Sequence, residues 1–232
     1  MIKKVLGSFD KLRINFGVIL LFLLIPSLLF NLLLIQKTEK LKEKNLVQIV
    51  ADGDTLILKT GITVRLVNIE TPELEYCGGP EAKKRMEELV LGKVIEMETV
   101  SADMYHRPLV LVTVGNKFVN EIMLKEGLAR YDGSPSPKRD VLKKAYDYAF
   151  GKKIGIFSSR CRQEEPEDPK CLIKGNIRRE NNKKYYFFPG CSEYQRTIVE
   201  KDIGESWFCS EKEAEKAGFS KAANCFGKKY QP

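Results

Sequence analysis

The sequence lacks several signals that would assign a protein to a class directly. None of its six cysteines forms a C-x-x-C pair, which disfavours a zinc ribbon. Its one histidine, His106, lies in a loop-like segment where histidines are usually solvated, so we do not assign it as a general base. No small-residue cleavage site or lipid-attachment cysteine follows the apolar run near the N-terminus, which disfavours a cleaved signal peptide. No internal repeat is visible.

The charge of the chain indicates a polyanionic partner without proving one. The 232 residues allow one or two modest domains, and a hydrophobic content of 43% is enough for a core. A net charge of +8 suits nucleic acid or an anionic lipid surface. A lysine-rich, solvated surface would account for the same charge.

An uncharged apolar run at residues 16–35 predicts a retained transmembrane helix, because about 20 apolar residues span a bilayer. Four basic residues lie on each side, so flanking charge does not settle the orientation. All the cysteines follow the run, and disulfides persist in oxidising compartments. We therefore expect a single-pass cell-membrane protein with a short cytoplasmic segment at 1–15 and an extracytoplasmic catalytic domain.

Composition divides the remaining chain into four segments. Residues 36–44 form a charged stalk, and a globular domain follows at 45–161. An acidic, proline-containing linker at 162–170 leads to a small cysteine-containing module at 171–232.

The domain at 45–161 alternates strand and helix signals. Five short segments rich in β-branched residues predict strands, and three amphipathic segments predict helices that begin near Pro80, Val119 and Ser136. This order predicts an α+β fold, a five-stranded OB-type β-barrel with about three helices, which is a common platform for nucleic acids. The strand segments are 45–50, 55–59, 62–69, 93–100 and 109–114.

Three clusters of charged residues offer the groups that phosphodiester hydrolysis requires. That reaction needs oxygen ligands for a metal, guanidinium groups for the phosphate and a carboxylate that acts on water. The first cluster is a turn, the second is a strand that bends at Pro72, and the third is a loop. They are Asp52-Gly53-Asp54-Thr55, the segment from Arg65 to Glu73, and Asp103-Met104-Tyr105-His106-Arg107.

These clusters carry a family resemblance. DGDT, RLVNIETPE and YHRPL occur in the order and at the spacing of the staphylococcal nuclease (thermonuclease) family, which the sequence resembles over residues 45–161. GPEA at 79–82, VNEIMLKEGLA at 119–129 and GIFS at 155–158 extend the resemblance. It implies a metal-dependent endonuclease that forms 3′-phosphate products.

The resemblance implies a calcium site. Asp54, Glu70 and the backbone carbonyl of Thr71 would hold Ca²⁺, which accepts hard oxygen ligands and water. Asp52 would be a further carboxylate near the metal. The family usually has aspartate where this chain has Glu70. Taken alone, Asp54 is more typical of a turn residue than of a metal ligand.

The resemblance also implies the catalytic residues. Arg65 and Arg107 would bind the phosphate through bidentate guanidinium groups, and Glu73 would position or deprotonate the attacking water. Tyr105 and Tyr131 are candidates for stacking on bases, although packing explains each as well. Arg65 and Glu70 would alternatively form a surface ion pair. Pro108, which follows Arg107, departs from the family pattern and restricts the backbone there.

The cysteines suggest a disulfide framework whose connectivity the sequence leaves open. We expect a Cys77–Cys161 bond that holds the end of the domain near the candidate site. For the tail we favour Cys171–Cys225 and Cys191–Cys209, with a four-thiolate metal site as the alternative. The tail resembles the small sunset-type module found behind bacterial nucleases, which supplies no catalytic residue.

The sequence therefore predicts a membrane-anchored, extracytoplasmic, Ca²⁺-dependent nuclease that hydrolyses DNA or RNA with low sequence specificity. We expect no organic cofactor and a monomer. The alternative is a non-catalytic nucleic-acid-binding module on the cell surface. Such relatives usually lack an acidic or arginine position, whereas this chain has them all. A third class is a surface adhesin in which the barrel displays the tail.

Overall fold

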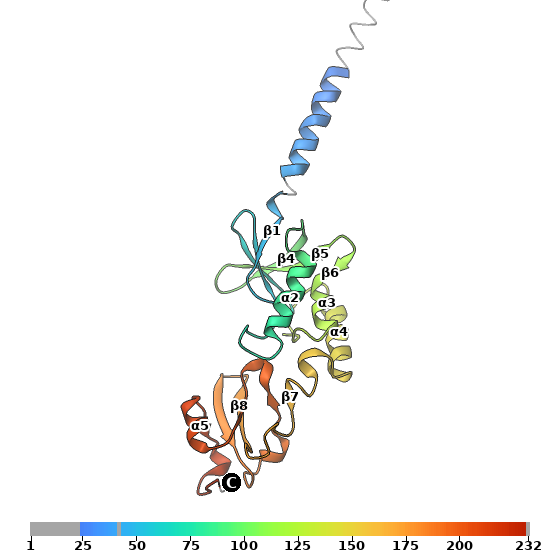
Figure 1. Cartoon of the computed structure of the whole chain (residues 1–232). Helices are drawn as coiled ribbons and strands as arrows, with labels where there is room; N and C mark the ends of the chain where they lie inside the picture. Colours follow the sequence, from blue (N-terminus) through green and yellow to red (C-terminus); the bar gives the residue numbers. More distant parts are fainter. Residues whose placement is uncertain (1–23, 41–42, 231–232) are drawn as a thin grey trace, which may run out of the picture. The chain divides into compact units, whose positions relative to one another are not determined.

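A computed structural model describes residues 24–40 and 43–230 (Figure 1). The chain forms two compact units, one up to Asn45 and one from Leu46 onward. In the first unit, residues 24–40 are helical. The predicted cytoplasmic segment at 1–15 lies outside the described residues.

The predicted transmembrane helix at 16–35 is not supported. Within residues 24–40 and 43–230, no helix combines the length and the apolar character that crossing a bilayer requires. The described helix is apolar only as far as residue 35 and then continues into the charged sequence at 36–40. Residues 16–23 of the predicted span lie outside the described residues.

The second unit begins with a barrel of the predicted OB type. The sheet has the order β1-β2-β3-β5-β4, with β6 paired to β5. The amide of Val47 donates to the carbonyl of Lys93 (3.0 Å), so the first strand meets the segment that leads into β4 and the two sheet edges join. The short strand β6 is one more than predicted. The strands are β1 (Val47–Val50), β2 (Thr55–Leu58), β3 (Thr63–Leu66), β4 (Glu96–Ala102), β5 (Pro108–Val114) and β6 (Lys117–Phe118).

The three predicted helices are present and lie next to one another beside the barrel (Figure 1). The first, α2 (Gly79–Val90), has proline in its first turn and buries an apolar stripe that includes Met86. The second, α3 (Val119–Lys125), packs between the other two. The third, α4 (Arg139–Gly151), begins three residues later than Ser136, where the prediction placed its start.

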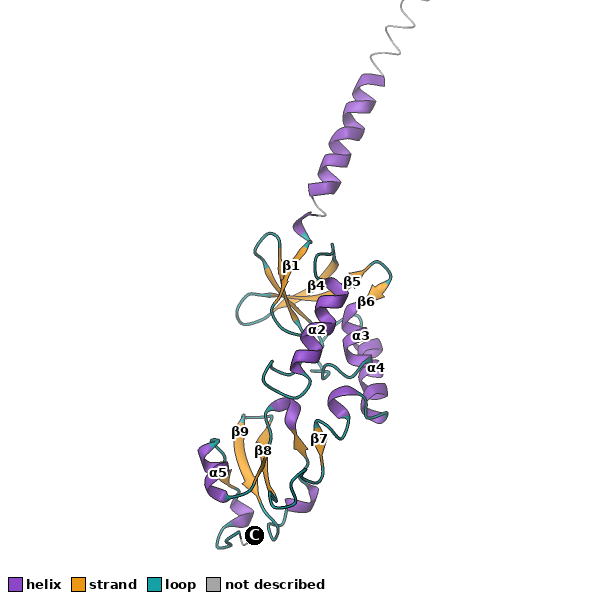
Figure 2. Cartoon of the chain, in the orientation of Figure 1, coloured by secondary structure: helices purple, strands orange, loops and turns teal. Residues whose placement is uncertain are grey.

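The cysteine-containing module is a small sheet with one helix beside it (Figure 2). The strands β8 (Ile173–Arg178) and β9 (Lys183–Phe187) form an antiparallel hairpin. The hairpin is flanked by β11 (Trp207–Phe208) and β12 (Ser220–Lys221). The helix α5 (Glu211–Lys216) packs against this sheet over a core of aromatic side chains.

The structure contains three disulfides and, among the described cysteines, no free thiol. Cys77 and Cys161 are joined, as expected. The tail pairing that we favoured is wrong: Cys171 is joined to Cys209 and Cys191 to Cys225. The alternative of a four-thiolate metal site is wrong too, because disulfide sulfurs are not thiolate ligands.

Strand pairing explains the tail connectivity. Phe208 of β11 lies opposite Ile173 of β8 in an antiparallel register. Cys209 follows the first of these residues, and Cys171 precedes the second by two positions. The ladder therefore brings these two cysteines together, and sequence spacing alone does not reveal that ladder.

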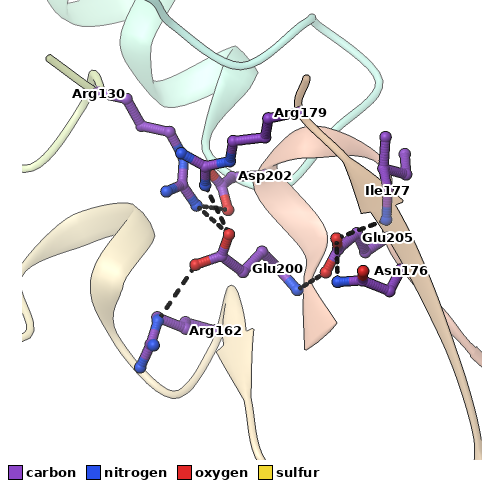
Figure 3. A network of polar contacts seen from close by, with 8 residues as sticks. All are labelled: Arg130, Arg162, Asn176, Ile177, Arg179, Glu200, Asp202 and Glu205. Atoms are coloured by element: carbon purple, nitrogen blue, oxygen red, sulfur yellow. Dashed lines mark hydrogen bonds and ion pairs between the residues drawn. The ribbon is translucent and has the colours of Figure 1, made fainter. Parts of the chain in front are cut away.

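The barrel and the module meet through a strand pair and a buried ion pair. Part of the predicted linker at 162–170 is a strand, β7 (Arg162–Gln163), which pairs with β10 (Val199–Glu200) of the module. Beside this pair, Arg130 of the barrel domain donates two hydrogen bonds to Asp202, of 2.6 and 2.8 Å (Figure 3). Both side chains are at least 93% buried. Two parallel charge-assisted bonds fix the orientation of the guanidinium.

A second carboxylate, that of Glu200, forms ion pairs with three arginines at the same junction (Figure 3). Arg130 and Arg162 approach it at 3.3 Å, and Arg179 approaches it at 2.6 Å. The surrounding guanidinium groups lower the pKa of Glu200 against the opposing effect of burial. The carboxylate is therefore charged at neutral pH and holds the junction together.

We expect Asp202→Asn to lower the free energy of unfolding by on the order of 3 kcal/mol, because it leaves the buried Arg130 with a weakened partner. The measurement is guanidinium unfolding followed by circular dichroism. The matched control is Glu81→Gln, which removes one charge from an exposed pair with Arg160 and should cost less than about 1 kcal/mol. Equal losses in the two variants would contradict the assignment.

Glu205 is a buried acid next to this network. Its carboxylate accepts hydrogen bonds from the side chain of Asn176 and from the backbone amides of Ile177 and Glu200, all between 2.7 and 2.8 Å (Figure 3). Burial raises the pKa of Glu205 from its ordinary value of 4.5 to about 7, although the backbone donors oppose the shift. Folding therefore favours the protonated form of this side chain.

This raised pKa predicts a pH dependence. Because the folded pKa of Glu205 exceeds the unfolded one, its contribution to stability is present below about pH 4.5 and is lost as the pH rises through about 7. We expect this group to lower the free energy of unfolding by on the order of 1–3 kcal/mol between pH 5 and 8. Glu205→Gln should flatten that slope, measured by unfolding followed through the fluorescence of Trp207. Identical slopes in both proteins would disprove the assignment.

Candidate active site

The DGDT turn directs Asp54 into the protein. The carboxylate of Asp52 accepts hydrogen bonds from the backbone amides of Asp54 (3.0 Å) and Thr55 (2.7 Å), which closes the turn. At Gly53, a Cβ atom would lie 2.7 Å from a methyl carbon of Thr71, so only glycine permits this approach. The side chain of Asp54 is consequently 2% exposed.

Asp54 joins the first two clusters. One carboxylate oxygen accepts hydrogen bonds from the hydroxyl of Thr55 (3.0 Å) and from Nη1 of Arg65. The other accepts from the amide (3.0 Å) and the hydroxyl (3.2 Å) of Thr71. Burial raises the pKa of Asp54 to about 6, although Arg65 opposes the shift. Arg65 thus pairs with Asp54, and not with Glu70 as the alternative hypothesis had it.

The bend from Glu70 to Glu73 is fixed from both sides. Before it, the buried Asn68 has a φ of 63°, a conformation that asparagine tolerates better than most residues. Glu70 exchanges two backbone hydrogen bonds with Arg130, of 2.9 and 2.8 Å. The side chains of Glu70 and Glu73 are exposed and line a cavity of about 260 Å³ together with Thr71. The backbone is held while both carboxylates face open space.

Arg107 reaches the same edge of the barrel from the third cluster. It lies two residues before Leu109, which is opposite Arg65 in the parallel pair of β3 and β5. The carboxylate of Asp103 accepts from the Nε of Arg107 (2.6 Å) and from its backbone amide (2.9 Å). Pro108 begins β5 and leaves this arrangement intact.

The two candidate stacking residues differ in their surroundings. The side chain of Tyr105 is 71% exposed, and its ring centroid lies 5.5 Å from the guanidinium carbon of Arg107. Tyr131 is partly buried against the hydrophobic core, with its ring 6.3 Å from that of Tyr146. The surroundings of Tyr105 suit contact with a base, whereas those of Tyr131 suit packing.

The residues at this edge fit a Ca²⁺ ion in the chemistry of their donors. Asp54 offers a buried carboxylate, and its bonds hold Thr71 beside it at the bend that carries Glu70. Ca²⁺ accepts carboxylates, backbone carbonyls and several waters, so it does not require three clustered acids. Across the described residues, one group of three potential metal ligands has its ligand atoms within 4.8 Å of one another. It is Asp168 with Cys171 and Cys209, and the two sulfurs are joined in a disulfide.

Sequence reasoning missed part of the cavity wall. Arg130 lies one residue beyond the motif VNEIMLKEGLA at 119–129, and a buried arginine gives no local signal. The module supplies further lining residues that lie about 100 positions or more along the chain from the bend. Only the folded structure brings them there. They are Ile177, Arg179, Asn182, Asp202 and Ile203.

An OB-type barrel that carries a buried aspartate, two arginines and two exposed glutamates offers the charged groups that phosphodiester hydrolysis requires. Residues 63–159 match the family model described as staphylococcal nuclease homologue. The chain belongs to the staphylococcal nuclease family. Its enzyme class is therefore that of the nucleases, which hydrolyse phosphodiester bonds.

Several relatives are similar over about half of the chain. An "uncharacterized endonuclease" of Haemophilus influenzae is 32% identical over 127 residues, which cover 50% of this chain and 68% of the relative. The "micrococcal nuclease" of Shigella flexneri is 29% identical over 133 residues, 50% of this chain and 74% of the relative. The "staphylococcal-like nuclease CAN1" of Arabidopsis thaliana is 32% identical over 117 residues, 49% of this chain and only 33% of the relative.

Proposed function

We propose that this protein is a Ca²⁺-dependent nuclease that hydrolyses DNA or RNA with low sequence specificity. The observation that carries the proposal is the buried Asp54, whose hydrogen bonds with Arg65 and Thr71 tie the DGDT turn to the bend that carries the exposed Glu70 and Glu73. A module that only binds nucleic acid would not need this set of acids. The proposed residues all lie in one chain, so we expect a monomer to suffice.

The side chains have separable roles in this proposal. Asp54, Glu70 and the carbonyl of Thr71 would hold Ca²⁺, with Asp52 fixing the turn beneath them. When bound, Ca²⁺ offsets the negative charge that develops on the attacked phosphate.

The arginines and Glu73 would act on the substrate itself. Arg65 uses Nη1 for Asp54, and Arg107 uses Nε for Asp103, so each guanidinium keeps further N–H donors for phosphate oxygens. Glu73 would orient the attacking water and accept its proton.

We also propose that the protein works outside the cytoplasm. All six cysteines are paired in disulfides, and such bonds persist in oxidising compartments. Denatured DNA and RNA are the substrates to test first.

The decisive assay compares cleavage of denatured DNA with Ca²⁺ and with excess chelator. We expect the full chain to require Ca²⁺. We expect Glu73→Gln to lower kcat by roughly 10²- to 10⁴-fold, because an amide cannot accept the proton of the attacking water. The matched control is Glu75→Gln, an exposed glutamate two residues further along the same loop, which should retain activity.

Two results would contradict the proposal. If cleavage continues with excess chelator, the activity does not depend on Ca²⁺. Absence of cleavage by the oxidised wild-type chain, with binding of nucleic acid intact, would favour the non-catalytic binding module. In that case Glu70 and Pro108, which depart from the family pattern, would be the first residues to revert.

A further inference from the structure

The module forms part of the cavity at the candidate active site. On one side this cavity is lined by Glu70, Thr71 and Glu73 of the barrel domain. On the other side it is lined by Arg179 and Asn182, which lie at the tip of the hairpin between β8 and β9. The hairpin tip, defined as residues 178–184, therefore shares a cavity with Glu70 and Glu73, although Asp54, Arg65 and Arg107 do not line that cavity.

The hairpin tip is strongly basic. Its sequence RRENNKK contains four basic side chains and one acidic one, and all seven residues are exposed. Arg178 lies opposite Lys183 in the antiparallel register, so their side chains share one face of the hairpin. On the same face, the ring of Tyr185 lies 4.9 Å from the guanidinium carbon of Arg178. Cations beside an aromatic ring are typical of surfaces that bind single-stranded nucleic acid.

Among the ion pairs of residues 24–40 and 43–230, one involves the hairpin tip. Arg179 is bonded to Glu200, but Arg130 and Arg162 already neutralise that carboxylate and are much less exposed. The side chain of Arg179 is 53% exposed, and an ion pair in such a position adds little stability. While Nη2 is bonded to Glu200, the guanidinium keeps further N–H donors for a phosphate at the cavity.

We propose that the hairpin tip binds the phosphate backbone of the nucleic-acid strand that leads away from the cleavage site. Arg179 and Asn182 would contact the strand at the cavity, and Arg178 and Lys183 would contact it further out. This inference rests on the proposed nuclease function and adds a substrate-binding role for the module. It predicts longer substrates to be held better than short ones.

The first test uses Arg178→Gln with Lys183→Gln in the full chain, because neither residue takes part in the junction with the barrel. The probe is a fluorescent DNA single strand of about 20 nucleotides, longer than a typical site of roughly 4–16. Binding is measured by anisotropy with excess chelator, so that cleavage does not interfere. We expect affinity to fall on the order of 10-fold at 0.1 M salt. The slope of log affinity against log salt should become shallower by about 1.4.

The matched control is Lys212→Gln with Lys216→Gln, which removes two positive charges from exposed positions on α5 of the same module. We expect binding close to that of the wild type. A hairpin variant that binds as well as the wild type would overturn the proposal. Equal losses in the two variants would also overturn it, since net charge alone would then explain the effect.

A second variant, Arg179→Gln, tests the cavity itself. We expect it to raise KM several-fold for the long strand and to raise KM less for a dinucleotide, which makes fewer contacts with the hairpin tip. Equal losses on both substrates would overturn a role in holding the strand. These measurements are separate from the test of the proposed function, which is Ca²⁺-dependent cleavage by the wild type.

Discussion

The bond between Arg130 and Asp202 is the interaction on which the arrangement of this molecule depends. The backbone of Arg130 pairs with Glu70 at the candidate site, while its side chain pairs with Asp202 of the module. One residue thus connects the bend that carries the proposed metal ligand to the module. Two buried charges are stable only while both are present, so this connection joins the module to the barrel cooperatively.

The candidate site has two parts, one held by bonds within the barrel and one completed by the module. Asp52, Asp54 and Thr71 are fixed by hydrogen bonds within and between neighbouring segments of the barrel, and these bonds do not involve the module. The cavity beside them is completed by Arg179 and Asn182, whose positions depend on the junction. In the two proposals, the barrel carries out the chemistry at the phosphate and the module retains the strand.

The sequence predicted what local rules determine. The barrel, its three helices and the Cys77–Cys161 bond follow from strand patterns, helix starts and a cysteine placed beside the candidate site. The tail disulfides depended on the register of β8 with β11, which no local pattern fixes. The transmembrane prediction treated the apolar run at 16–35 as one membrane span. The described helix is apolar only as far as residue 35 and continues into charged residues at 36–40.

The departure at Glu70 is understandable from the cavity. Its backbone is clamped between the bond of Thr71 to Asp54 and the bridge to Arg130, so the extra methylene cannot be absorbed by a backbone shift. The longer side chain must extend into the cavity, where about 260 Å³ is open to it. Residues of the module line the same cavity. The cavity that the barrel and the module line together therefore has room for the extra methylene of Glu70.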